Sequence, residues 1–146
     1  MDATFLVTYY YPHFLAVVFL ACLLWTDVPA KGRFLARTLV ALGVATVLAH
    51  ANRWFDFWPA HRWFASGHMT FSLGLTLSLG MLRFWSLAIT LPLLVPFGVA
   101  LVALHFHDIW DVMGAFPLVL IVYGIVYGRP GVSPSMPPLD RVVVSP

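Results

Sequence analysis

Charge is scarce in this sequence. Glutamate is absent, the acidic residues are all aspartate, and charged residues make up only 10% of the 146 positions. A soluble domain carries about 25% charged residues. So few charges cannot cover a folded surface that faces water, and the composition therefore argues against a soluble domain.

Cysteine and basic residues are scarce as well. Cys22 is the single cysteine, which excludes an internal disulfide bond. The net charge is only +2 and the basic residues form no run, so nothing favours a nucleic-acid partner. Hydrophobic residues are abundant instead, at 61% with a mean hydropathy of +0.89, in a length that allows one domain.

Five apolar stretches approach or exceed the length of about 20 residues that a helix needs to cross a bilayer. They cover residues 4–25, 34–49, 66–82, 84–106 and 110–127. The first is interpreted as a retained span, because it lacks the basic region that begins a signal peptide. We therefore predict an all-α, polytopic integral membrane helix bundle of about five transmembrane helices at residues 1–128. A proline-rich, flexible tail follows at residues 129–146.

Positive charge is divided unequally between the two sides of such a bundle. Six of the eight Lys and Arg residues fall on one side, and only Arg53 and Arg62 fall on the other. Cytoplasmic loops carry the excess of Lys and Arg. The sequence thus predicts a cell or inner membrane protein with a cytoplasmic C-terminus and an extracytoplasmic N-terminus.

Most of the histidines lie in two segments, residues 50–68 and 105–111. Five of the six are found there, and the predicted topology puts both segments on the extracytoplasmic side. A single histidine at the end of a span is more often an ordinary interfacial residue. Ionisable groups gathered near membrane depth are costly and usually functional, so the two segments together predict a site.

The residue types in these segments suit phosphoryl chemistry. Ser66, Gly67 and His68 open the third stretch, where the free N–H groups of a helix N-terminus favour an anion and serine is a good N-cap. His107 and Asp111 are four residues apart, so they share a face if that turn is helical. A histidine oriented by a carboxylate is a reasonable nucleophile, and a second histidine could serve as the acid.

These residues resemble two signature motifs of the type 2 phosphatidic acid phosphatase superfamily. The tripeptide at Ser66 is similar to its Ser-Gly-His motif, and His107 with Asp111 is similar to its His-x-x-x-Asp motif. Adding His105 gives a pattern similar to that of the sphingomyelin synthase branch. The resemblance covers roughly residues 50–120.

The resemblance implies a membrane phosphatase or phosphotransferase that acts on a lipid-linked phosphate without a metal or other cofactor. By position, His107 would form a phosphohistidine oriented by Asp111, and His68 would protonate the leaving oxygen. Ser66 and Gly67 would hold phosphate oxygens. The expected partners are a phospholipid substrate and the bilayer, with the oligomeric state open.

Phosphate also needs positive charge. The arginine of the family motif has no counterpart here, and Arg53 and Arg62 are the basic side chains expected on the same side. His50 and His105 are expected as accessory residues.

Two other interpretations stay open. The chain could be a catalytically degenerate relative that binds lipid or a membrane partner. It could also be a haem or metal protein, because imidazole is a common ligand of both.

Overall fold

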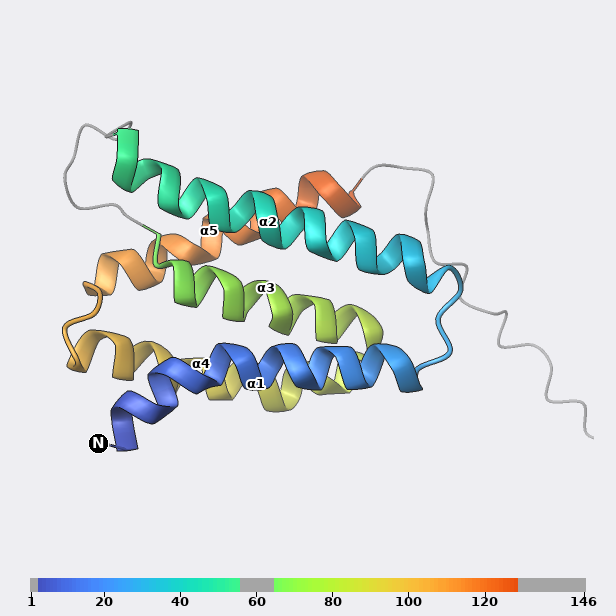
Figure 1. Cartoon of the computed structure of the whole chain (residues 1–146), viewed down its shortest axis with the longest axis horizontal. Coiled ribbons are helices and arrows are strands. Elements are labelled where there is room, and N and C mark those ends of the chain that lie inside the picture. The colour runs from blue at the N-terminus through green and yellow to red at the C-terminus, as the bar shows by residue number, and fades with distance from the viewer. Residues whose placement is uncertain (1–2, 56–64, 129–146) are drawn as a thin grey trace, which may run out of the picture.

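A computed structural model describes residues 3–55 and 65–128. Within these two ranges the chain is helical and contains no strand. The helices are α1 (Ala3–Trp25), α2 (Lys31–Phe55), α3 (Gly67–Leu82), the single 3-10 turn η1 (Phe84–Ser86), α4 (Leu87–Ala103) and α5 (Ile109–Tyr127). Successive α-helices run in opposite directions along one bundle axis (Figure 1). The predicted all-α class is confirmed for the described residues, whereas the tail predicted at residues 129–146 lies outside them.

Helix boundaries differ from the predicted ones at two places. α2 is longer than the stretch at residues 34–49, because polar residues at both of its ends continue the helix. The stretch at residues 84–106 begins as η1, and α4 ends at Ala103. Among the described residues, Lys31–Ala51, Phe84–Ala103 and Ile109–Tyr127 are long and apolar enough to cross a membrane.

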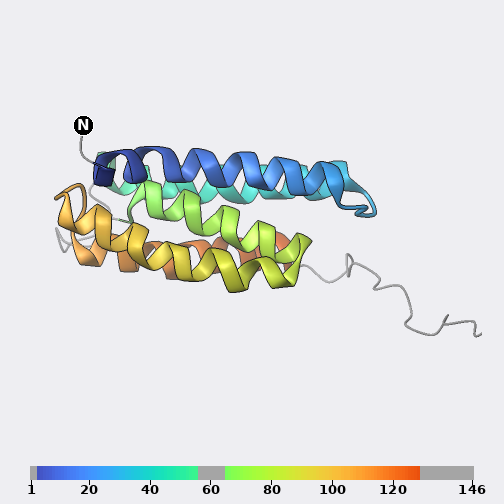
Figure 2. The same cartoon turned by 90° about the horizontal axis from the view of Figure 1, so that it is seen from below.

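α3 lies at the centre of the bundle and packs against each of the other four α-helices. Seen from below, α1 and α2 lie on one side of it, and α4 and α5 lie on the other (Figure 2). Small residues permit this close packing. A Cβ atom added to Gly74 would lie 2.5 Å from the Leu42 side chain and 3.1 Å from the Tyr123 hydroxyl, so a larger residue would displace these two side chains of α2 and α5.

Two apolar clusters hold the layers onto α3. Leu73 of α3 is buried with Phe97 of α4 and Val119 of α5. Leu79 of α3 is buried with Leu15 of α1 in the second cluster. Truncating such fully buried side chains typically costs about 2–5 kcal/mol, because the cavity left behind does not close completely.

Hydroxyl groups occupy the interior of the bundle. Buried ones include Thr70, Ser72, Thr76 and Ser78, all on α3. The Tyr123 hydroxyl donates a 2.7 Å hydrogen bond to the Gly74 carbonyl and lies 2.8 Å from the Ser78 hydroxyl. This contact fixes α5 against α3 in depth and in rotation.

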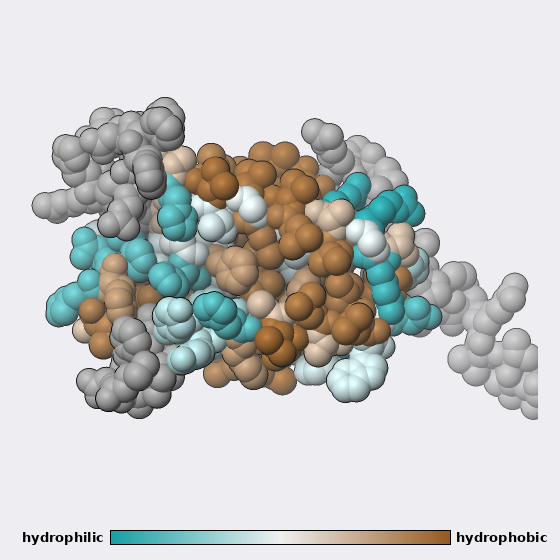
Figure 3. Space-filling model, in the orientation of Figure 1, coloured by the Kyte–Doolittle hydropathy of each residue, from teal (hydrophilic) through white to brown (hydrophobic). Residues whose placement is uncertain are grey.

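Apolar side chains occupy the outside of the bundle. Val95 and Val99 of α4 and Leu120, Ile121 and Ile125 of α5 are all exposed. Hydrophobic residues fill the middle of the face in Figure 3, and hydrophilic residues gather toward its two ends. The described residues therefore combine an apolar interior that includes buried hydroxyls with a surface that exposes many large apolar side chains.

Candidate active site

A pocket of about 390 Å3 opens at the end of the bundle where α1, α3 and α5 begin. We call it the histidine pocket. Its lining comes from α1, α2, α3 and the segment before α5: Pro12, His13, Ala16, Thr46, His50, Gly67, His68, Phe71 and His107. At this end of the bundle α3 begins nearer the middle than the neighbouring helix ends do (Figure 1).

Ser66 ends the connection from α2 and starts α3. Its backbone is extended, its side chain is buried, and its Oγ accepts a 3.3 Å hydrogen bond from the Met69 N–H. This is the N-cap geometry expected of serine. Gly67 and His68 line the histidine pocket, and their N–H groups belong to the first turn of α3, where backbone N–H groups have no partner inside the helix.

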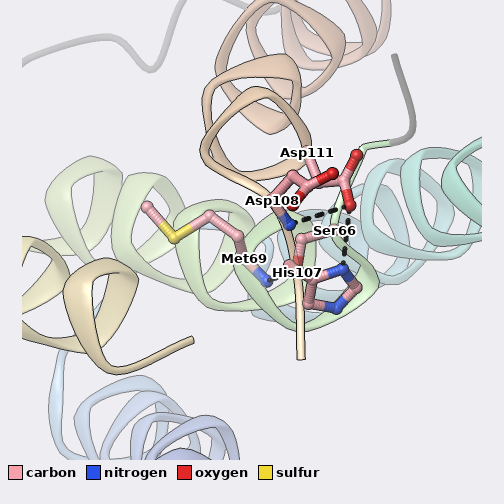
Figure 4. Close-up of polar contacts among 5 residues, drawn as sticks. All are labelled: Ser66, Met69, His107, Asp108 and Asp111. Atoms are coloured by element: carbon pink, nitrogen blue, oxygen red, sulfur yellow. Dashed lines mark hydrogen bonds and ion pairs between the residues drawn. The ribbon is translucent and has the colours of Figure 1, made fainter. Parts of the chain in front are cut away.

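His107 lies just before the N-cap of α5 rather than within a helical turn. Its Nδ1 is 3.4 Å from Oδ2 of Asp111, and the same oxygen accepts a 3.3 Å hydrogen bond from the Asp108 N–H (Figure 4). Asp111 thus folds back over the first turn of α5 and reaches both groups. When Nδ1 carries the proton toward Asp111, Nε2 keeps its lone pair for other chemistry.

The turn after α4 directs His107 toward α3. Ala103 ends α4, and His105 has a positive φ of 57°. The Phe106 N–H donates a 3.1 Å hydrogen bond to the Leu101 carbonyl, and the His105 N–H donates a 3.0 Å bond to that of Val102. These two bonds form a Schellman motif, in which a left-handed residue closes the helix.

The rings of His68 and His107 lie together at the histidine pocket. Their centroids are 6.1 Å apart and their planes are inclined by 60°. The side chain of His107 is 22% exposed and that of Asp111 is 15% exposed. A small oxyanion between the two rings could contact both of them and the first N–H groups of α3.

His50 belongs to the same site through a different contact. Its Nδ1 lies 2.8 Å from the Thr46 carbonyl oxygen. A Cβ atom on Gly67 would stand 2.5 Å from Cε1 of this ring and 3.2 Å from its Nε2. Gly67 is therefore needed so that the imidazole can approach the start of α3.

His13 is a pocket residue that sequence reasoning missed. It lies in α1, its Nδ1 is 3.0 Å from the Tyr9 carbonyl oxygen, and its ring stacks on that of Tyr9. In the sequence it only interrupted the first apolar stretch. The available signal was its position, because an ionisable residue within an apolar stretch is costly and usually functional.

The remaining candidates lie elsewhere or outside the described side chains. His105 is exposed and does not line the histidine pocket. Arg53 lies in the last turn of α2, where side chains are not described, and Arg62 lies outside the described residues. The part of the pocket lining that the structure describes contains no lysine or arginine.

The described residues also include no group of three or more His, Cys, Asp or Glu side chains arranged to hold a metal ion.

Comparisons with protein-family models, curated proteins and solved structures give no significant match to this chain.

Proposed function

We propose that this chain is an integral membrane enzyme that crosses the bilayer five times and transfers or hydrolyses a lipid-linked phosphate. The observation that carries the proposal is the pair of imidazoles, His68 and His107, whose centroids are 6.1 Å apart. They stand over the N-terminus of α3, and Asp111 contacts one of them. Nucleophile, acid and anion-binding N–H groups are the parts that phosphoryl transfer needs.

The polarity of the bundle supports the membrane part of the proposal. Its outside is apolar between two polar ends, and buried hydroxyls are grouped on α3. Positive charge lies at the end opposite the histidine pocket, where Lys31, Arg33 and Arg37 begin α2 and Arg83 follows α3. The excess of positive charge on cytoplasmic sides favours an extracytoplasmic pocket and a cytoplasmic C-terminus.

The proposed reaction has two steps. Nε2 of His107 attacks phosphorus, the bond from phosphorus to the lipid oxygen breaks, and protonated His68 gives that oxygen its proton. The oxygen of water or of an alcohol then attacks the phosphohistidine, the P–N bond breaks, and His68 takes up the proton. Asp111 stabilises the charge that develops on His107.

An apolar cavity of about 580 Å3 supports a lipid as the substrate. It lies between α4 and α5, and its lining consists of apolar residues that include Met69, Leu94, Val99, Ile109 and Met113. Met69 lies three residues after Ser66 and donates its N–H to it, so the cavity reaches the start of α3. Under this proposal a hydrocarbon chain would occupy this cavity while its headgroup enters the histidine pocket, with which the cavity shares no lining residue.

The proposal is tested by assaying the purified chain against phosphorylated lipids of different headgroups and acceptors. We expect phosphate release or transfer that vanadate inhibits and that H107A and H68A abolish. Acid-labile phosphate on histidine should accumulate in the wild type and be absent from H107A. Full activity in H107A would show that another group is the nucleophile.

Lipid binding without turnover is the second candidate, and one observation favours it. The 3.4 Å between His107 and Asp111 exceeds the roughly 2.7–2.9 Å of a strong charge-assisted hydrogen bond, so the nucleophile is held loosely. A binding protein would retain short-chain phosphatidic acid but release no phosphate from it. It would also leave its histidines unlabelled by a phosphate donor.

A further inference from the structure

The histidine pocket holds two more imidazoles than the proposed reaction uses. His68 and His107 account for the acid and the nucleophile, and His13 and His50 complete a lining of four histidines. A phosphate dianion brought into such a pocket needs positive charge nearby. Histidine is the ionisable side chain that the described lining offers for this purpose.

The two additional rings are held in the same way. Nδ1 of His50 is 2.8 Å from the carbonyl oxygen four residues earlier, and Nδ1 of His13 is 3.0 Å from the corresponding oxygen in α1. A carbonyl oxygen only accepts, so Nδ1 carries the proton in both rings. Nε2 is then the nitrogen that accepts or loses a second proton as the ring changes charge.

We propose that His13 and His50, in their protonated forms, bind the phosphate oxygens, so that the affinity of the pocket for a tetrahedral oxyanion falls as pH rises. This inference rests on the proposed function for the identity of the anion, a lipid-linked phosphate. His50 stands over the first residue of α3, where helix N–H groups also face the anion. His13 reaches the same pocket from α1.

The groups around these two rings determine the sign of the effect. The ionisable neighbours are His68 on α3, His107 with Asp111 at α5, and Tyr9, which stacks on His13. Imidazolium ions gathered in one pocket repel one another, and a dianion between them removes that repulsion. Anion binding and proton uptake therefore favour each other, and histidine changes charge between about pH 5 and 8.

Sulfate is a suitable probe, because it is a tetrahedral dianion that does not titrate in this range. We expect the full chain in detergent to bind sulfate about tenfold more tightly at about pH 5.5 than at about pH 7.5, as measured by calorimetry. The double variant H13Q/H50Q should lose most of this difference. H50R, which carries a permanent charge, should bind sulfate at about pH 7.5 more tightly than the wild type does, and the remaining pH dependence should come from His13.

H105G is the matched control, because it removes an imidazole at the same end that does not line the pocket. It should keep the pH dependence of the wild type. A double variant that is folded by circular dichroism and still shows the full pH dependence would overturn the inference. An H50R variant as pH-dependent as the wild type would overturn it as well, since a structural role for His50 predicts no such rescue.

The same proteins separate this inference from the proposed function. Sulfate binding that follows the expected pattern in a protein without turnover would retain the anion site and remove the enzymatic proposal. Turnover combined with pH-independent sulfate binding would support the enzymatic proposal and overturn the role of His13 and His50 in binding the anion. Displacement of sulfate by short-chain phosphatidic acid at lower concentration than by inorganic phosphate would assign the site to a lipid headgroup, and equal displacement would overturn that assignment.

Discussion

The backbone N–H of Ser66 donates a 2.8 Å hydrogen bond to the carbonyl oxygen of Asp111. Each of these residues controls one of the two central imidazoles, because Ser66 caps the helix that carries His68 and Asp111 contacts His107. The bond joins main chain to main chain, so substitutions of either side chain leave it in place. A substitution of the Asp111 side chain can therefore change the orientation of His107 while this main-chain bond still joins the start of α3 to α5.

Replacing Asp111 by asparagine should lower kcat without unfolding the protein. The amide oxygen can still accept from the Asp108 N–H, but the charge that stabilises protonated His107 is lost. Hydrogen bonds to charged groups are worth about 1.5–3 kcal/mol, which corresponds to a fall of about 10- to 100-fold. D108N is the control, since asparagine caps helices as well as aspartate does. Equal losses in both variants would argue against a role of Asp111 in the reaction.

Replacing Gly67 by alanine should disturb the histidine pocket. The new Cβ would stand 2.5 Å from the His50 ring and force that ring to move. We expect weaker sulfate binding and no gain in stability from the alanine, because the exposed His50 ring has to leave its place over α3.

Gly43 provides the matched comparison for this substitution. It also lies in a helix, and no atom lies within 4 Å of its added Cβ. G43A should stabilise the protein by about 0.4–1 kcal/mol, because alanine restricts the unfolded chain. Equal changes in the melting temperatures of G67A and G43A would mean that the His50 ring does not lie against Gly67 as described.

Replacing His105 by glycine should leave activity intact and raise thermal stability. A left-handed conformation costs a non-glycine residue about 1–2 kcal/mol, and glycine adopts it freely. The Schellman motif that directs His107 uses only backbone groups at this position. Loss of turnover in a folded H105G protein would instead make the imidazole itself part of the site.

Replacing Tyr123 by phenylalanine should destabilise the bundle by about 1–3 kcal/mol. The change removes the hydroxyl that bonds both the Gly74 carbonyl and the Ser78 hydroxyl, and only the 3.0 Å bond from the Ser78 hydroxyl to that carbonyl, within α3, remains. Y10F, at an exposed tyrosine of α1, should be nearly neutral in the same thermal unfolding experiment. Comparable stability in the two variants would show that the buried network does not hold α5 to α3.

The helices could be predicted because apolar length is a local property of the sequence. Their ends were harder to place. The fourth apolar stretch continues to Phe106, but α4 stops at Ala103 because His105 adopts a left-handed conformation, which hydropathy does not report. The extra length of α2 likewise depends on polar residues that hydropathy counts against a span.

The site could be predicted only in part. The spacing of His107 and Asp111 suggested a contact, but it arises from a side chain folded back over an N-cap rather than from a shared helical face. His13 could not be placed, because its depth and direction depend on how α1 packs against α3. Whether Arg53 and Arg62 supply charge stays a prediction.

The composition of α3 has a consequence for biogenesis. With 16 residues it is the shortest α-helix of the described ranges, and four of its buried residues carry hydroxyl groups. Such a segment gains little by entering lipid alone, because unpartnered polar groups are costly in hydrocarbon. The proposed five-span topology therefore predicts that α3 inserts as a hairpin with the more apolar segment that follows it, Phe84–Ala103. A nascent chain that ends after Leu82 should leave α3 accessible to labelling from the aqueous side, and protection of that truncated chain would contradict the order of insertion.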